Sequence, residues 1–186
     1  MPFKTTDIPD VLIFEPSVYK DERGWFYESY NEQTYKKQGL DIGFVQDNQS
    51  FSYHGVIRGL HYQLDPHAQT KLVRVLEGRV IDVAVDIRRG SPTFGKYVAV
   101  ELSAENKLQL LIPRGFAHGF SVLSETAQLA YKCDGLYSKE SEGGIRYDDP
   151  QLNIDWQVPA AKAIVSAKDL ELPFFAQCKN NFEYNG

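Results

Sequence analysis

The strongest constraint on the fold of this chain is a two-residue alternation of apolar and polar side chains that recurs in several short segments. Residues 79–87 show it most clearly, because Ile81, Val83, Val85 and Ile87 share one face of that run. Asp82 and Asp86 lie on the opposite face, because successive side chains of a strand point to opposite sides. The alternation therefore predicts a half-buried β-strand.

Further β-prone segments are separated by turn signals that contain glycine or proline, and they cover residues 71–76, 97–102, 108–112 and 127–132. Many short strands at this spacing are typical of an antiparallel sandwich or barrel, so we expect an all-β fold. A short helix is predicted over residues 31–38, with Asn31 as its cap and Gly39 at its end. One further turn is expected at residues 103–106. Residues 137–155 are predicted to form a long surface loop, after which the chain is expected to wrap the barrel.

Length and charge narrow the possible functions. The chain has 186 residues, enough to bury a core without disulfides, so residues 1–186 are predicted to form a single domain. Its net charge of -5 does not provide the broad basic surface that nucleic acids select, and the sequence contains no apolar run of membrane-spanning length. We therefore expect neither nucleic acid nor membrane as a partner. Two cysteines and an N-terminus without an apolar signal core favour a cytoplasmic protein with reduced thiols.

Two segments rich in glycine and aromatic residues each contain a histidine. The first contains His61, and the second, residues 113–120, has the spacing Pro-x-Gly-x-x-His that ends at His118. The second motif resembles one in the cupin superfamily, whose metal-binding members carry two histidines and a glutamate in their first motif. Here Gln63 and Lys71 occupy two of those ligand positions, and an ammonium group has no lone pair to give a metal ion. The chain thus resembles a cupin without a metal site.

The residues in these segments also suggest a kind of chemistry. Lys71 and Arg58 are candidates for stabilising an oxyanion or binding a phosphate. A neutral His61 is a competent general base, particularly when a carboxylate holds its ring, although a lone histidine is more often a hydrogen-bonded packing residue. The residues by themselves predict a metal-free proton-transfer enzyme that acts on a carbonyl or anionic substrate.

A wider set of motifs resembles, in the same order, those of the dTDP-4-dehydrorhamnose 3,5-epimerase family. These motifs are residues 21–28, 46–50, 58–63, 113–120, 131–133, 142–150, 154–156 and 166–169. The resemblance implies a cupin-type antiparallel β-barrel, or jelly roll, with a few short helices. It also implies an isomerase that inverts C3 and C5 of dTDP-4-dehydro-6-deoxy-D-glucose for dTDP-L-rhamnose biosynthesis. No cofactor is implied, because the C4 ketone itself acidifies the hydrogens at C3 and C5.

The resemblance also implies roles for individual residues. His61 matches the general base, Asp169 the carboxylate that pairs with it, and Tyr131 the acid on the opposite face of the sugar. Lys71 matches the residue beside the C4 oxygen, Tyr137 would stack on thymine, and no metal ligand is implied. Contacts with the dTDP-sugar are implied for Arg23, Phe26, Glu28, Gln46, Asn48, Arg58, His118, Tyr137, Glu142 and Lys168. A homodimer that exchanges strands between barrels is implied as well.

The pattern of residues leaves other interpretations open. Tyr131 shares a strand face with apolar neighbours, as a core tyrosine would, and Asp169 and Lys168 fit a solvated loop. Three further functions stay open, although Gln63 and Lys71 argue against the second of them. They are a sibling nucleotide-sugar 3- or 5-epimerase, a metal-dependent cupin enzyme, and a non-catalytic sugar-nucleotide-binding cupin.

Two local features depart from the expected patterns. Strict alternation places Arg58 and His61 on opposite faces, so both can reach one pocket only if Gly59 lies at a bulge or twist. Gly143 stands where a basic residue is expected in many relatives. The geometry of that second segment, and its effect on substrate handling, therefore stay open.

Overall fold

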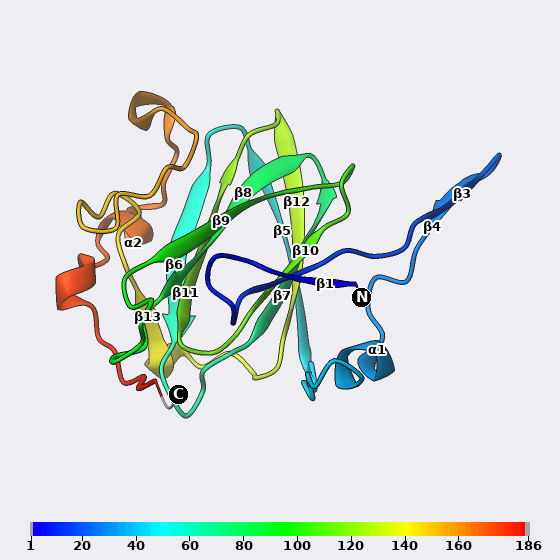
Figure 1. Ribbon diagram of the computed structural model, residues 1–186. Coiled ribbons are helices and arrows are strands. Elements are labelled where there is room, and N and C mark those ends of the chain that lie inside the picture. Colours follow the sequence, from blue (N-terminus) through cyan, green and yellow to red (C-terminus); the bar gives the residue numbers. More distant parts are fainter. Residues whose placement is uncertain (1, 185–186) are drawn as a thin grey trace.

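Two antiparallel β-sheets form the body of the computed structural model, which describes residues 2–184 (Figure 1). The spatial order of the six-stranded sheet is β1 (Phe3–Thr5), β2 (Leu12–Phe14), β10 (Gln109–Ile112), β7 (Lys71–Glu77), β12 (Thr126–Cys133) and β5 (Gln46–Tyr53). The order of the five-stranded sheet is β13 (Glu142–Gly144), β6 (Ile57–Gln63), β11 (Phe116–Val122), β8 (Arg79–Asp86) and β9 (Tyr97–Ser103). The predicted all-β fold is confirmed, and each predicted strand corresponds to one of these elements.

The inner faces of the two sheets pack against each other to form the main core. Val73 and Leu129 of the six-stranded sheet join the same buried cluster as Val80, Val98 and Phe120 of the five-stranded sheet. Burying one such side chain contributes about 1.5–3 kcal/mol relative to leaving it exposed. This apolar layer therefore holds the two sheets together over most of their length.

Strand β8 is buried on both faces, so the prediction of a half-buried strand is wrong. Ile81 belongs to an outer cluster that includes Trp156, whereas Val80 faces the core between the sheets. Asp82 and Asp86 share the inner side of the strand with Val80, and both are fully buried. The apolar face that the alternation identified is thus covered by a distant segment, and the two acids point between the sheets.

The predicted short helix is confirmed as α1 (Glu32–Lys36). The side-chain oxygen of Asn31 accepts hydrogen bonds from two backbone N–H groups of the first turn, at 2.9 and 3.4 Å. Gly39 follows the helix with a φ of 80°, a left-handed conformation that glycine adopts without steric cost. The residues after Ser103 form a non-helical turn, which the side chain of Asn106 closes.

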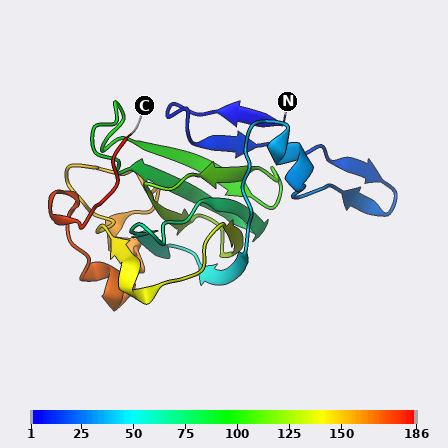
Figure 2. The ribbon, with the colours of Figure 1, turned by 90° about the horizontal axis from the view of Figure 1, so that it is seen from below.

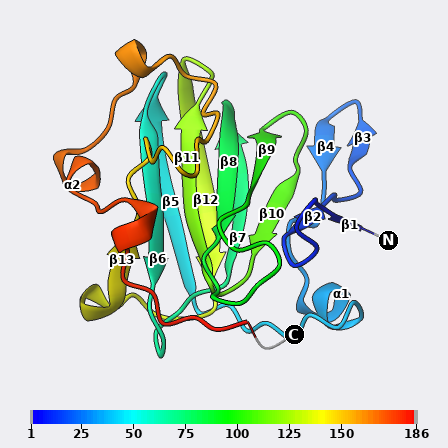
Figure 3. The ribbon, with the colours of Figure 1, turned by 60° about the vertical axis from the view of Figure 1, so that its left-hand side comes forward.

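The C-terminal region runs over the outer face of the five-stranded sheet, as expected (Figure 3). Its short helices are η1 (Lys139–Ser141), η2 (Ala160–Lys162), α2 (Ala167–Leu170) and η3 (Phe175–Gln177). Trp156 and Phe175 pack there against outward-facing residues of β6 and β8. The predicted surface loop, residues 137–155, differs from expectation because it contains β13 and the fully buried Ile145.

A hairpin of two short strands, β3 (Tyr19–Asp21) and β4 (Gly24–Phe26), projects away from both sheets (Figures 1 and 2). Its aromatic side chains are unusually open, with Trp25 58% and Phe26 70% exposed. The ammonium group of Lys107 lies 3.7 Å from the centre of the Trp25 ring and connects the hairpin to the barrel. Among residues 2–184, no helix has the length and apolar character needed to cross a membrane.

Candidate active site

One extra residue in β6 turns Arg58 and His61 to the same face. His61 pairs with His118 of β11, and Arg58 pairs with Phe120, so three steps along β6 match two steps along β11. This is the geometry of a β-bulge, and it confirms the irregularity expected at Gly59. A Cβ at Gly59 would lie 2.6 Å from the carbonyl oxygen of His118, and its φ is 114°, so glycine is required there. Directly paired residues share a face, which places Arg58 and His61 together on the inner side.

A cavity of about 1020 Å³ lies between the sheets and the C-terminal region. It is lined by many of the residues proposed from the sequence, namely Arg58, His61, Lys71, His118, Tyr131, Tyr137, Glu142, Lys168 and Asp169. These side chains come from the five strands β6, β7, β11, β12 and β13, from the segment that follows β12, and from α2. The fold therefore gathers residues from distant parts of the chain around one space.

The first histidine of this cavity is paired with a buried acid. His61 Nε2 lies 2.8 Å from Asp169 Oδ1, although the two residues are 108 positions apart. Asp169 lies in α2, where Ser166 caps its N–H at 3.1 Å and the Gly59 N–H donates to its second oxygen at 3.3 Å. Burial by itself raises the pKa of Asp169, but its bonds to these three partners hold the pKa below the usual range. An ionised Asp169 accepts the Nε2 proton and leaves Nδ1 of His61 to act as a base.

The second histidine is paired with an acid that the sequence reasoning did not single out. His118 Nε2 lies 3.0 Å from both carboxylate oxygens of Asp82. Asp82 is fully buried, and burial raises its pKa while His118 acts in the opposite direction. The alternation showed only that Asp82 lay on the polar face of a strand. Finding the pair requires the knowledge that β8 and β11 are neighbours in the sheet.

Lys71 and Tyr131 line the cavity from the six-stranded sheet, whereas His61 comes from the other sheet. Lys71 Nζ donates to Gln69 Oε1 at 3.3 Å, and burial lowers the pKa of Lys71. The Tyr131 ring centroid lies 6.5 Å from that of His118, and burial raises the pKa of the Tyr131 phenol. Tyr131 also packs against the main core. It is therefore both a core tyrosine and a residue that lines the cavity.

Another part of the cavity wall combines positive charge with an aromatic ring. Lys168 Nζ lies 2.8 Å from Glu142 Oε2, and this contact lowers the pKa of Glu142. Glu142 in turn lies beside the Tyr137 hydroxyl and raises the pKa of Tyr137. Arg58 Nε donates to Ser52 Oγ at 3.0 Å. Such a wall suits a ligand with an anionic group and a flat ring.

Gln46 and Asn48 lie beside this cavity on the inner side of β5. Gln46 Nε2 donates to Asn48 Oδ1 at 3.1 Å, so the two side chains point the same way, as residues two apart in a strand do. Asn48 is the register partner of Tyr131, and Gln46 Oε1 accepts the Tyr137 N–H at 2.9 Å. Gln46 therefore bonds to a residue that lines the cavity, and Asn48 lies opposite another in the sheet.

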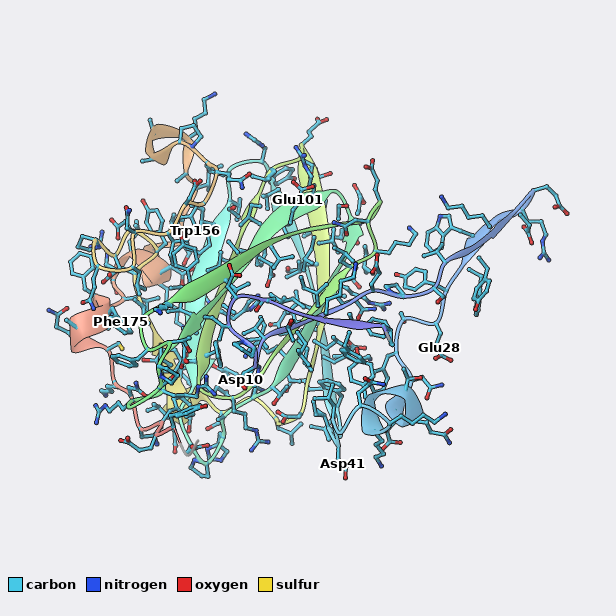
Figure 4. All side chains as sticks on the ribbon, in the orientation of Figure 1. Asp10, Glu28, Asp41, Glu101, Trp156 and Phe175 are labelled. Atoms are coloured by element: carbon cyan, nitrogen blue, oxygen red, sulfur yellow. The ribbon has the colours of Figure 1, made fainter. Side chains whose placement is uncertain are left out.

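The hairpin residues Arg23, Phe26 and Glu28 are not among the cavity-lining residues of the described chain. Arg23 is bound to Asp21 within the hairpin, at 2.5 Å. Glu28, which follows the hairpin, lies on the opposite side of the molecule from Trp156 of the C-terminal region (Figure 4). One copy of the chain thus assembles most of the predicted site but leaves these three residues outside it.

The two positions that correspond to cupin metal ligands take part in hydrogen bonds to protein groups. Gln63 Nε2 donates to the carbonyl oxygen of His67 at 2.6 Å, and Gln63 Oε1 accepts the N–H of Ser138 at 2.6 Å. Lys71 bonds to Gln69 as described above. Within residues 2–184, no three His, Cys, Asp or Glu side chains are grouped in a way that could hold a metal ion.

Comparison with known proteins agrees with the motifs. The model of a family described as dTDP-4-dehydrorhamnose 3,5-epimerase matches residues 5–177. A dTDP-4-dehydrorhamnose 3,5-epimerase of Shigella flexneri is 58% identical over 166 residues, which are 89% of this chain and 91% of that protein. The crystal structure of dTDP-4-dehydrorhamnose 3,5-epimerase from Elizabethkingia anophelis NUHP1 superposes with a TM-score of 0.91 at 57% identity and covers 96% of this chain and 98% of its own.

A fourth comparison includes a bound sugar nucleotide. The structure of dTDP-6-deoxy-D-glucose-3,5-epimerase from Legionella pneumophila, in complex with dTDP-4-keto-L-rhamnose, has a TM-score of 0.95 at 50% identity. The match covers 99% of this chain and 98% of that one. The two-sheet architecture and these neighbours define a cupin-type jelly-roll isomerase. Within that class, the chain belongs to the dTDP-4-dehydrorhamnose 3,5-epimerase family. The resemblance inferred from the motifs and the expected fold class are thereby confirmed.

Proposed function

We propose that this chain converts dTDP-4-dehydro-6-deoxy-D-glucose into dTDP-4-dehydro-L-rhamnose by inverting C3 and C5 without a cofactor, as a step of dTDP-L-rhamnose biosynthesis. The observation that carries the proposal is the placement of an acid-paired base, His61, and of Lys71 and Tyr131 from the other sheet, around one cavity. The names of its relatives, and the ligand in the Legionella structure, support this substrate.

The proposed mechanism follows from the acidity of a keto sugar. The C4 carbonyl acidifies the C3 and C5 hydrogens, because the carbanion delocalises onto the oxygen as an enolate. His61 removes the proton, and Asp169 stabilises the resulting imidazolium. The Lys71 ammonium stabilises the enolate oxygen. Tyr131 then donates a proton from the other face, which inverts the centre. Before the next inversion, His61 releases its proton to solvent and the Tyr131 phenolate takes one up.

The remaining cavity residues bind the nucleotide part of the substrate in this proposal. Arg58 and Lys168 pair with the diphosphate, and they supply the local positive charge that an acidic protein needs for such a ligand. Tyr137 stacks on thymine, which its open ring permits because it is 56% exposed. The other contacts are assigned to Gln46, Asn48, His118 and Glu142.

The proposal includes a homodimer in which the hairpin of one copy completes the cavity of the other. Arg23 and Phe26 belong to the hairpin, which projects away from both sheets (Figure 2), and Glu28 follows it closely. None of the three lines the cavity of its own chain. The outer face of β5 also presents Phe51 and Tyr53, which are 47% and 63% exposed. Large exposed apolar groups of this kind favour contact with a second copy.

The dimer has its own test. Light scattering should give twice the chain mass, and mixed dimers of Arg23→Ala and His61→Asn chains should recover activity that neither variant has. In such a dimer one cavity contains both an intact His61 and an intact hairpin. A monomeric mass, or the absence of recovery after subunit exchange, would contradict the shared site.

The proposal also covers the domain organisation, the cellular compartment and the partners of the protein. Residues 1–186 act as a single domain in the cytoplasm, without nucleic acid or a membrane as a partner. Cys133 and Cys178 are both free thiols, in agreement with a reducing compartment. One cooperative unfolding transition and recovery of the protein in the cytosolic fraction are the expected results.

The decisive experiment is incubation of the protein with dTDP-4-dehydro-6-deoxy-D-glucose in deuterated water, followed by NMR. Deuterium should appear at both C3 and C5, and the product should have the L-rhamno configuration. Exchange at only one centre would indicate a sibling epimerase. Tight binding without exchange would indicate a binding module, and activity that requires a stoichiometric metal would indicate a metal-dependent cupin.

A further inference from the structure

Three glutamine side chains hold the backbone on both sides of Tyr137. Gln69 Nε2 donates to the Gly135 carbonyl at 2.7 Å, and Gln63 Nε2 donates to the Leu136 carbonyl at 3.3 Å. Gln46 Oε1 accepts the Tyr137 N–H at 2.9 Å. Gln63 Oε1 then accepts the next backbone N–H, that of Ser138, at 2.6 Å. Four consecutive residues, 135–138, are therefore bonded to side-chain amides from other parts of the chain.

Apolar packing cannot hold this segment in place. Leu136 is 67% exposed and Tyr137 is 56% exposed, so neither side chain is anchored in a core. A segment with few buried apolar contacts opens easily unless polar bonds restrain it. The glutamine bonds are thus the main restraint on where the Tyr137 backbone lies.

Gln63 is the central member of the three. Its side chain is 5% exposed, and its amide makes bonds on both sides of Tyr137, to residues 136 and 138. It also lies two residues after His61 on β6, so the strand that carries the proposed base directly holds the segment that carries Tyr137. A neutral amide fits this role because it donates to carbonyls with one end and accepts an N–H with the other.

We infer that Gln63 is a positioning residue for nucleobase binding, which acts through residues 136–138 to hold the Tyr137 ring where the base stacks. This inference rests on the proposed function, because it assumes that the ligand contains thymine. A preformed Tyr137 lowers the conformational entropy lost on binding. Gln63, at a ligand position of metal-binding cupins, therefore serves substrate affinity in this chain.

The test compares Gln63→Leu with the unchanged protein by calorimetric titration with dTDP and with inorganic pyrophosphate. Losing hydrogen bonds on both sides of Tyr137 should weaken dTDP binding about tenfold, since each net bond is modest. Pyrophosphate lacks a base, so its affinity should stay within about twofold, and kcat at saturating substrate should stay within about threefold. Gln151→Leu, at an exposed loop position, is the matched control and should change none of these values.

A double-mutant cycle shows whether the effect passes through Tyr137. In a Tyr137→Ala background, Gln63→Leu should weaken dTDP binding by less than about twofold, because the ring it positions is absent. Gln63→Asn, which retains the amide on a shorter side chain, replaces Gln63→Leu in every arm if the latter does not fold.

The inference is wrong if dTDP binding is unchanged, if dTDP and pyrophosphate weaken equally, or if the two substitutions are additive. An unchanged protein that fails to bind dTDP would instead contradict the proposed function.

Discussion

His61 and His118 are direct partners in the antiparallel pairing of β6 and β11, yet their Nε2 atoms bond to two different aspartates. His61 is paired with Asp169 from the C-terminal region and has a side chain that is 47% exposed. His118 is paired with Asp82 between the sheets and is 8% exposed. The two histidines therefore differ in access to a ligand, and we expect them to differ in chemical role.

His61→Asn should reduce deuterium exchange at C3 and C5 by about 10²–10⁴-fold, because it removes the proposed general base. Asp169→Asn should have a smaller effect, on the order of ten- to a hundredfold, because it removes only the group that orients and stabilises the ring. NMR exchange rates at saturating substrate measure both. Near-normal exchange in His61→Asn would falsify the assignment of the base.

Activity should fall at high pH as Lys71 loses its proton. Burial lowers the pKa of Lys71. As the pH rises, the ammonium group therefore loses its proton before the ordinary lysine pKa of about 10.4 is reached. The phenol of Tyr131 has a raised pKa and should deprotonate only above its ordinary value of about 10. Lys71→Arg retains its charge and should move the basic limb of the pH–rate profile upward. An unmoved limb would show that another group controls it.

Asp86 should contribute stability that depends on pH. Burial raises its pKa, but bonds to Arg88, Ser91 and Thr93 outweigh burial and lower it. The contribution is therefore complete above the unfolded value of about 3.9 and is lost as the pH falls through the lower folded value. Asp86→Asn should lower the unfolding free energy by about 3 kcal/mol at neutral pH and flatten the acid decline.

Denaturant unfolding between neutral and acid pH measures this effect. Asp148→Asn is the control, because Asp148 pairs with Arg146 at the surface and should contribute less than about 1 kcal/mol. Equal losses in the two variants would contradict the role given to the buried carboxylate.

The Tyr35 hydroxyl is buried without a hydrogen-bond partner among the described residues, in a cluster with Phe3, Phe14 and Tyr30. Tyr35→Phe should leave the unfolding free energy unchanged or raise it by about 1 kcal/mol, since it removes an unsatisfied polar group. Tyr35→Ala should lower it by about 3–5 kcal/mol by leaving a cavity. Thermal or denaturant unfolding tests both, and a clear loss in Tyr35→Phe would show that the hydroxyl has a partner.

Local patterns were sufficient to predict several strands of the two sheets and the first helix. The alternation located β8, β9 and β10, apolar and β-prone residues located β7 and β12, and a capping asparagine with a following glycine located α1. Strand alternation and helix capping depend only on residues that are close together in the sequence, so they can be recognised without a structure. The bulge at Gly59 was also predictable, because two side chains were required on one face and strict alternation separated them.

Properties that depend on distant segments were not predictable in this way. The apolar face of β8 points outward because Trp156 and its neighbours cover it, and they lie some seventy positions later in the chain. The pairing of Asp82 with His118 depends on which strands are adjacent. The position of the hairpin with Arg23 outside its own cavity likewise depends on tertiary arrangement.

The extra residue in β6 also limits how the pocket can change. Because that residue lies between Arg58 and His61, a β6 strand that paired one-to-one with β11 over the same four residues would turn one of the two side chains to the outer layer. Substitutions alter the chemistry of the pocket wall. Only a shift of β6 by one residue relative to β11 alters which side chains form the wall. Insertions and deletions in this short stretch should therefore be far less tolerated than in the loops, where length can vary freely.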